Sequence, residues 1–459
     1  MRANTLLLSF TFYLFIGPLK AYPQPLASSI QSLQDCVAYA LSHSPDLQQS
    51  YLNRDITLHT IRSKLADWYP QIGLSFDLQH YLQLPTSVFP DFTNPNGPKR
   101  EVKVGVANSS TLTFSVNQTL FNRDVLLAAR SAGDVKKQTA QSIVENQINT
   151  IVDVSKAYYN VLIAQRQLDI AEEDIVRLRK SMEDTYAQYQ SGLVDKTDYE
   201  RAKIALNNAI ANRQAVAQQV RVAYAYLKQL MGLPADSSLA LSYDTSEMDR
   251  NVWFDTTQVL QYSNRIEYQL LQTNRRLLVD EWQYNKWSFL PSVSAFYNYN
   301  LAYLNDQFSQ VYSRSFPNSL IGIQLSLPIF QGTKRVQNIA ISRLEIKQTD
   351  LALLALQHQI RTEYEQALAN YKSNLYNWQT LKENVEMARD VYETLSLQYQ
   401  AGVKTYLDVI TAETDLRTAE FNYLNALLQV LSSKLDLEKA MGLIRVTGYP
   451  SSFQASVEP

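Results

Sequence analysis

Few residues of this chain are spaced for chemistry. Asp195 and Asp198, three positions apart, could form a pair of carboxylates. Aspartates beside a helix turn are usually caps or solvated charges, so this interpretation is weak. The four histidines, His43, His59, His80 and His358, show no metal-ligand spacing. No glycine-rich phosphate loop and no nucleophile elbow occurs. The sequence therefore predicts that the protein is not an enzyme and holds no cofactor or metal.

The composition narrows the class of protein further. The 459 residues include 42 basic and 44 acidic side chains, a net charge of −2. This balance argues against a nucleic-acid binder, which would carry a basic face. Cys36 is the only cysteine, so no intrachain disulfide can form, and its surroundings predict no lipid anchor. Arg2, a short apolar stretch and Ala21 predict a secretory signal over residues 1–21, cleaved before Tyr22.

The chain repeats itself. The tract from Tyr189 to Val194 returns from Tyr399 to Lys404, with the glycines offset by 402 − 192 = 210 residues. Asp198 returns as Asp408 at the same offset, and so does the later Met-Gly-Leu tract, at 231–233 and 441–443. A constant offset over this length indicates two copies of one large structural unit.

Each unit contains a tract without proline, between Pro98 and Pro234 and between Pro328 and Pro450. Such tracts permit long helices. We expect a helix over about 122–190, a turn at Gly192 and a return helix to about 230. The second unit should repeat this over about 333–400, with a turn at Gly402 and a return to about 440. At 1.5 Å per residue each outgoing helix would be about 100 Å long, so it must pack lengthwise against other helices.

Four stretches alternate apolar and polar residues, near 71–84, 110–120, 293–303 and 321–329. This period is typical of strands with one apolar face. A soluble half-buried sheet is the alternative, but the lengths suit membrane strands of about 9–11 residues and the signal sequence favours the membrane. Tyr81, Tyr299 and Tyr303, with Phe76, could form interfacial girdles. The strand connections, about 85–103 and 304–317, should be extracellular loops, with both hairpin turns at the far periplasmic end.

Four strands cannot close a barrel, because both edges would leave backbone groups unpaired in lipid. The chain should therefore share its strands with other copies. Bacterial barrels begin at about eight strands, so at least two copies are needed, and three would give 12 strands.

Several motifs together resemble the TolC-type outer-membrane efflux proteins. They are Leu327–Gly332 with its counterpart Leu120–Asn122, and the two Tyr-x-x-Gly turns, the second followed by Leu407–Val409. The resemblance covers nearly the whole mature chain. It implies an α+β, mainly α fold: a homotrimer with a 12-stranded outer-membrane barrel, continued by a long periplasmic α-helical barrel. It also implies a passive export duct, served by an inner-membrane pump through a periplasmic adaptor protein.

The resemblance also implies a gate at the helix tips. Thr197 and Asp198 match residues that lock to a tyrosine and a basic residue of the second hairpin, here Tyr399 and Lys404. Lysine stands where the type member of the family has arginine. Asp408 matches the first of two aspartates that ring the constriction, and Thr411 replaces the second.

These patterns divide the chain into a signal peptide, two similar halves and a tail. The expected segments are 1–21 (signal), 22–69 (helical), 70–121 (strand pair), 122–232 (hairpin 1), 233–288 (equatorial segment and helix), 289–331 (strand pair), 332–442 (hairpin 2) and 443–459 (tail). A structural coiled-coil envelope protein without a channel is the alternative function, although it would not need four alternating strands. The sequence does not distinguish drugs, metals or proteins as cargo.

Overall fold

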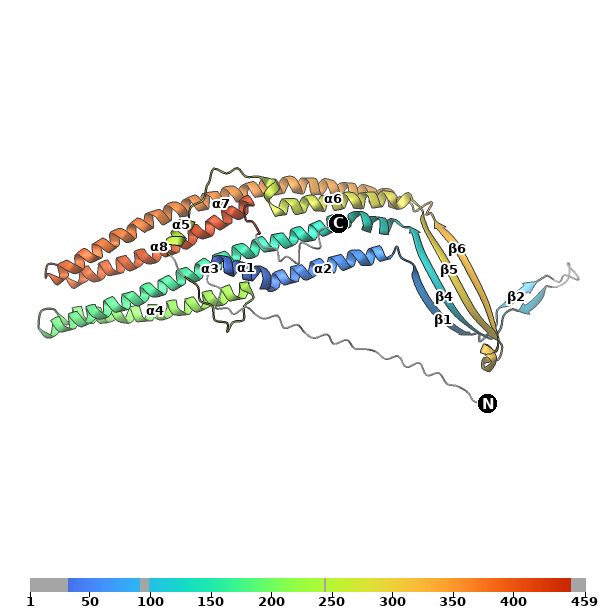
Figure 1. Cartoon of the computed structure of the whole chain (residues 1–459), viewed down its shortest axis with the longest axis horizontal. Helices are drawn as coiled ribbons and strands as arrows, with labels where there is room; N and C mark the ends of the chain where they lie inside the picture. Colours follow the sequence, from blue (N-terminus) through green and yellow to red (C-terminus); the bar gives the residue numbers. More distant parts are fainter. Residues whose placement is uncertain (1–31, 91–98, 243–244, 447–459) are drawn as a thin grey trace.

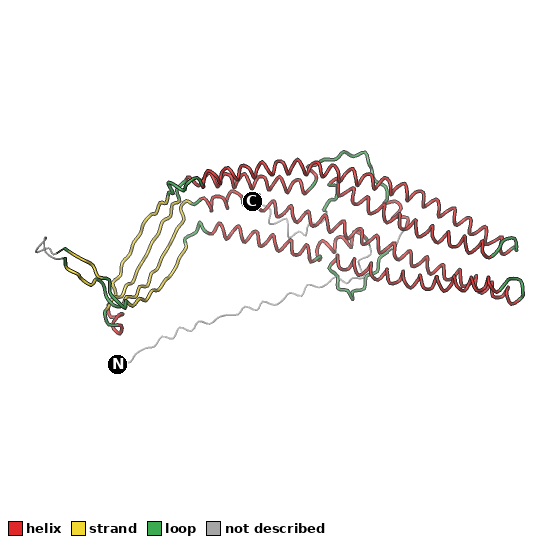
Figure 2. Tube along the Cα trace, turned by 180° about the vertical axis from the view of Figure 1, so that it is seen from behind, coloured by secondary structure: helices red, strands yellow, loops and turns green. Residues whose placement is uncertain are grey.

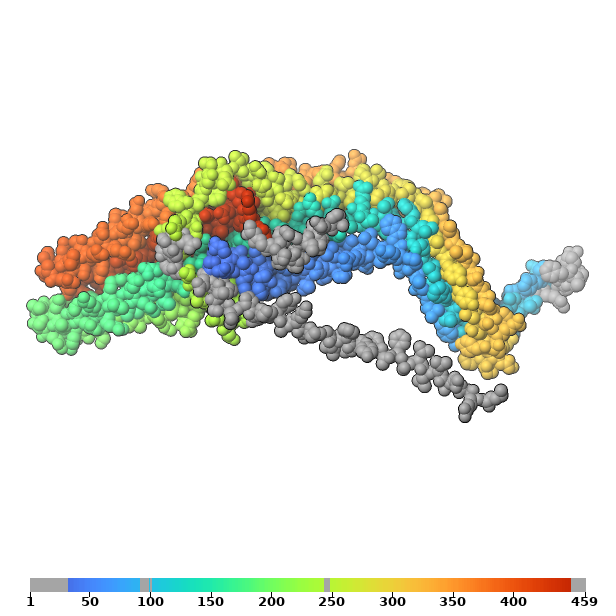
Figure 3. Space-filling model, in the orientation of Figure 1, coloured from blue at the N-terminus to red at the C-terminus, as the bar shows by residue number. Residues whose placement is uncertain are grey.

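A computed structural model describes residues 32–90, 99–242 and 245–446. The molecule is long and slender, with a small sheet at one end and two helix tips at the other (Figure 1). The space-filling view shows a bent rod, because the sheet leaves the helical body at an angle (Figure 3). The predicted signal peptide and most of the predicted tail lie outside the described residues.

Two helical hairpins form most of the rod. The first pairs α3 (Arg123–Gln190) with α4 (Lys196–Met231), and the second pairs α7 (Lys334–Gln400) with α8 (Tyr406–Met441). The expected starts of the outgoing helices and the ends of both hairpins are confirmed to within about one residue, which is the usual margin for helix boundaries. α3 starts at a defined cap, since the Asn122 side chain accepts a hydrogen bond from the Asp124 amide at 2.8 Å.

The strands form one antiparallel sheet in the order β1-β4-β5-β6 (Figure 2). The strands are β1 (Gln71–His80), β4 (Asn108–Phe121), β5 (Ser292–Asn305) and β6 (Ser315–Ser326). β1 and β6 are the open edges of this sheet. Apolar residues on both edge strands face solvent, with Ile72 68% and Ile321 79% exposed. Nothing in the described part of the chain covers them, which does not fit a half-buried soluble sheet.

Two strand ends differ from the prediction. β1 stops at His80 rather than near 84, because its partner β4 begins at Asn108, which pairs with His80. β6 begins at Ser315 and stops at Ser326, whereas the alternating pattern ran on to Ile329. Pro328 has no amide hydrogen to donate to a neighbouring strand, so the pattern outlasts the pairing.

Shorter elements fill the connections, and the two that lie between strands of the sheet were not predicted from the sequence. A separate hairpin of β2 (Thr86–Phe89) and β3 (Arg100–Lys103) projects beyond the far end of the sheet (Figure 1). The other connection contains the short helix η4 (Phe308–Ser313). Near the middle of the rod lie α1 (Leu33–His43), α5 (Thr245–Asn251) and η2 (Tyr262–Asn264). Toward the sheet, α2 (Pro45–Ala66) and α6 (Ile266–Lys286) run beside the long helices, and η3 (Trp287–Phe289) precedes β5.

The hydrophobic core lies at mid-length, where α1 packs against the first hairpin and α3 packs against α8 of the second. Its fully buried side chains include Leu162, Leu227, Leu427 and Leu431. Cys36 is also buried there, and burial raises the pKa of its thiol to about 12, so it behaves as an apolar core residue. None of the described helices is long and apolar enough to cross a membrane.

The duplication is visible in the packing. The end of the first hairpin at Gly232 lies against the carbonyl of His43, where α1 joins α2. The end of the second hairpin at Gly442 lies against Asn264, where η2 joins α6. In each half, therefore, the returning helix stops against the joint between two shorter elements. The neighbouring Arg265 reinforces the second joint by donating to the Ala440 carbonyl at 3.0 Å.

Candidate functional site at the helix tips

The two hairpins turn in the same way and lie side by side at one end of the rod (Figures 1 and 2). Gly192 has a φ of 76° and Gly402 a φ of 75°, in the left-handed region that favours glycine. The residue after each glycine donates back into its helix: Leu193 to the Gln188 carbonyl at 2.9 Å and Val403 to the Gln398 carbonyl at 2.8 Å. The two turns therefore share the same backbone geometry.

The aspartates at the tips are engaged with their own helices. Asp195 caps α4 by accepting a hydrogen bond from the Lys196 amide at 3.0 Å, while Asp198 forms an ion pair with Arg201 at 3.6 Å. The two carboxylates thus have separate local partners, which gives no support to the carboxylate-pair interpretation. No cluster of metal-ligating side chains occurs in the described parts of the chain.

Asp408 takes part in the cap of α8. It accepts hydrogen bonds from the Thr405 amide at 3.0 Å and from the Thr405 hydroxyl at 2.8 Å. These hydrogen bonds, with a smaller contribution from Lys404, hold the pKa of Asp408 below its ordinary value. The carboxylate is partly exposed and stays ionised, as a selectivity ring would require.

Tyr399 is the predicted gate residue that reaches the other hairpin. Its hydroxyl donates to the Gln188 side-chain oxygen on α3 at 2.7 Å, and burial raises the pKa of Tyr399. Its ring also lies against that of Tyr406, with centroids 6.0 Å apart. Thr197 and Lys404 are exposed, and in the described part of this single chain Asp198 does not pair with Lys404. That contact would need a neighbouring copy.

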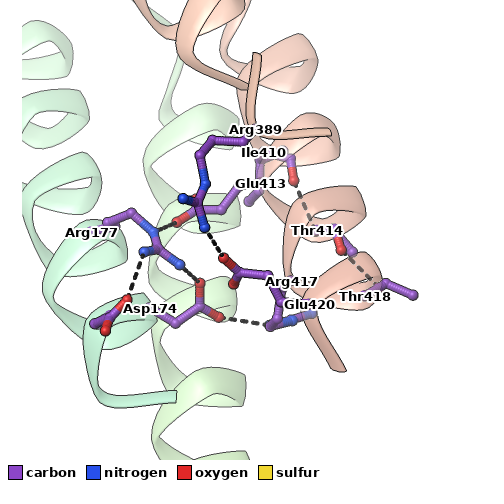
Figure 4. Close-up of polar contacts among 10 residues, drawn as sticks. Asp174, Arg177, Arg389, Ile410, Glu413, Thr414, Arg417, Thr418 and Glu420 are labelled. Carbon is purple, nitrogen blue, oxygen red and sulfur yellow. Dashed lines mark hydrogen bonds and ion pairs between the residues drawn. The ribbon is translucent and has the colours of Figure 1, made fainter. Parts of the chain in front are cut away.

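The sequence analysis missed a buried ionic cluster further up the hairpins (Figure 4). Asp174 on α3 lies 2.7 Å from Arg177 of the same helix and 3.3 Å from Arg417 on α8. Arg177 also faces Glu413 on α8 at 3.4 Å. Beside this group, Arg389 on α7 donates to Glu420 on α8 at 3.0 Å. The side chain of Asp174 is only 2% exposed and that of Glu413 only 6%.

A signal for this cluster exists in the sequence. Asp174 interrupts a buried stripe on α3 that contains Ile170, Ala171 and Leu178. On α8, Glu413 and Glu420 belong to the same buried stripe as Val409, Ala412 and Leu416. A charged side chain at a position where the helical period expects an apolar residue indicates a buried polar contact.

Comparisons with known proteins assign the chain to a family. A profile described as "Outer membrane efflux protein" matches residues 37–233 and 269–443, that is, both halves of the chain. The chain belongs to this family. This confirms the resemblance found in the motifs and places the protein in the outer membrane. The two matched segments also correspond to the duplication inferred from the 210-residue offset.

Individual relatives of this outer membrane efflux protein are distant. "Outer membrane protein TolC" of Salmonella enteritidis is 22% identical over 439 residues, which are 91% of this chain and 83% of that protein. "Alkaline protease secretion protein AprF" of Pseudomonas aeruginosa is 23% identical, over 70% of this chain and 68% of its own. The solved CmeC outer membrane channel of Campylobacter jejuni superposes with a TM-score of 0.69 at 15% identity, covering 89% of this chain and 85% of its own. That likeness shows the shared fold.

Proposed function

We propose that three copies of this chain form a passive export duct across the outer membrane, opened at its periplasmic tip by an adaptor and an inner-membrane pump. The observation that carries the proposal is the pair of open sheet edges. Within the described residues, β1 and β6 leave their outer backbone groups without strand partners, and both faces of the edge strands are exposed. Unpaired backbone N–H and C=O groups have a high free energy in lipid, so these edges must pair with neighbouring copies.

The helices support the same conclusion. α3 and α7 contain 68 and 67 residues, so each is about 100 Å long at 1.5 Å per residue. Many apolar side chains of α7 have no cover in a single chain, among them Leu344 at 62% and Leu351 at 68% exposed. Neighbouring copies would cover this surface and continue the barrel as a helical tube, with the tips at Gly192 and Gly402 closing its far end.

Two measurements test the proposal. The purified protein should migrate as a detergent-resistant oligomer that heating converts to a monomer, and it should conduct ions in planar bilayers. A structural coiled-coil envelope protein would do neither. The topology has its own test with single cysteines. Labels at Asn94 and Asp306 should react on intact cells, whereas labels at Ser191 and Ala401 should not, and the reverse pattern would contradict the orientation.

The partners and the cargo call for a separate experiment. One relative is named as a protease secretion protein, so polypeptides are candidate cargo beside the drugs and metals that the sequence leaves open. Crosslinking in cells, followed by purification of the trimer, should recover a periplasmic adaptor and an inner-membrane pump. The class of pump that is recovered would assign the cargo.

A further inference from the structure

We infer that the buried cluster of Asp174, Arg177, Glu413 and Arg417 is a proton-sensitive joint between the two hairpins. It holds them together when Glu413 is neutral and loosens when Glu413 is ionised. The inference rests on the proposed function as an export duct, because loosening this joint would ease separation of the tips. It adds to the duct a response to periplasmic pH.

The position of the cluster makes it a joint. The apolar core shared by the hairpins reaches Ile170 on α3. Closer to the tip, Leu178 packs with Leu206 and Ala209, which belong to the same hairpin. Between these levels, charged side chains of α3 meet those of α8. Glu413 lies about two turns above the start of α8, so a change here acts close to the tip.

Glu413 is the incompletely paired member of the joint. Asp174 has an arginine within reach of each carboxylate oxygen, Arg177 at 2.7 Å and Arg417 at 3.3 Å. In contrast, Glu413 Oε1 and Arg177 Nε are buried, lie 3.4 Å apart and make no hydrogen bond in the described structure. A buried carboxylate without full hydrogen bonding is costly. Ionisation of Glu413 therefore opposes tight packing of α3 on α8.

Burial and the surrounding charges determine whether the joint tightens or loosens as the pH rises. Burial, followed by the charge of Asp174, raises the pKa of Glu413 from 4.5 to about 7, although Arg177 and Arg417 oppose the shift. The other titratable groups facing it are Tyr392 on α7 and Tyr406 on α8. The packed joint thus binds a proton more tightly than a hydrated carboxyl would. The stabilisation by this proton is complete below pH 4.5 and is lost as the pH rises through about 7.

Histidines do not supply an alternative sensor at the tips. The four histidines are His43, His59, His80 and His358, all far along the chain from the hairpin turns. Burial also raises the pKa of Asp169, Glu145 and Glu438, but the largest resolved carboxyl shift, to about 7, is that of Glu413. The Glu413 variants therefore decide whether a transition between pH 6 and pH 8 comes from this group.

The experiment measures single-channel conductance of the full-length protein in planar bilayers at pH 6 and pH 8. We expect the wild-type conductance to rise by about twofold or more at pH 8, with a midpoint near 7. Glu413→Gln keeps the side chain neutral, so its ratio should be close to one. Glu413→Leu is a second neutral variant, which should show the same ratio if the glutamine variant fails to assemble.

Glu420→Gln is the matched control. It makes the same change on the same helix, at a nearly buried carboxylate that pairs with Arg389 instead. Its pH ratio should equal that of the wild type. A wild-type duct that conducts equally at pH 6 and pH 8, or an unchanged ratio in both neutral Glu413 variants, would overturn the joint but leave the duct standing. A wild-type protein that never conducts would overturn both.

Discussion

The Tyr399 hydroxyl on α7 donates a hydrogen bond to the Gln188 side chain on α3 across 2.7 Å. The residues are 211 positions apart, and each lies about one turn before the glycine of its own hairpin. This contact joins the tips of the two hairpins within one chain. A lock of this kind acts before any contact between copies, so each protomer can contribute separately to the closed end.

Tyr399→Phe should loosen the closed tip, because it removes the hydroxyl and leaves the Gln188 oxygen without this donor. A hydrogen bond contributes about 0.5–1.5 kcal/mol, and three symmetric copies act on the same closed state. We expect higher conductance in planar bilayers and greater sensitivity of cells to large antibiotics. Tyr376→Phe is the control, since Tyr376 is 74% exposed on the same helix. Equal leakiness in both variants would argue against the lock.

Asp198→Ala combined with Lys404→Ala should also open the tip if these residues pair between copies. In the described part of the single chain Asp198 pairs with Arg201 at 3.6 Å and not with Lys404, so the predicted pair would have to form between protomers. Exposed ion pairs contribute about 0.2–1 kcal/mol each, and salt weakens them. The charge exchange Asp198→Lys with Lys404→Asp should restore the closed conductance. If Arg201→Ala opens the tip as much as the double variant, the pair within the helix accounts for the effect.

The long helices and the strands of the sheet could be predicted from the sequence, because their patterns extend over many residues. Proline-free tracts and repeated glycines predicted α3, α4, α7 and α8, because local chemistry sets where helices stop. Alternation predicted the four strands of the sheet. The β2–β3 hairpin escaped prediction because its strands have only four residues each, too few for a period to emerge.

The candidate site also contains features that the sequence predicted and features that it did not. The turn glycines and capping residues are local, so the repeated tracts exposed them. The Asp174 cluster depends on which faces of α3 and α8 meet, a tertiary fact that no local pattern states. In the sequence, the helical period places Asp174 and Glu413 at positions where apolar residues are expected, but only the packing shows which charged residues they contact.

Gly442→Ala should destabilise the protein much more than Gly402→Ala. Both glycines have left-handed φ values, 69° and 75°, so both variants carry a backbone cost of about 1–2 kcal/mol. A Cβ at Gly402 would meet nothing within 4 Å, but one at Gly442 would lie 2.8 Å from the backbone of Asn264. The temperature at which the heated oligomer dissociates should therefore fall further for Gly442→Ala. Equal losses would mean that the end of α8 does not rest on the η2–α6 joint.

Asp408 should have two separable roles, one in stability and one in ion selectivity. Hydrogen bonds from Thr405 lower its pKa, so the ionised form stabilises the folded state above the ordinary value of 3.8. That contribution is lost as the pH falls through the lowered pKa. Asp408→Asn should reduce the cation preference of the channel, because it removes a negative charge from each of the three tips.

Thr405→Ala separates the two roles. It removes the hydroxyl of the capping box but retains the Asp408 carboxylate. Loss of such a cap costs about 0.5–2 kcal/mol, so the thermal stability should fall while the reversal potential in a salt gradient stays that of the wild type. Asp408→Asn should shift the reversal potential toward zero. If Asp408→Asn changes only stability, Asp408 is a cap alone and the constriction draws its selectivity from other residues.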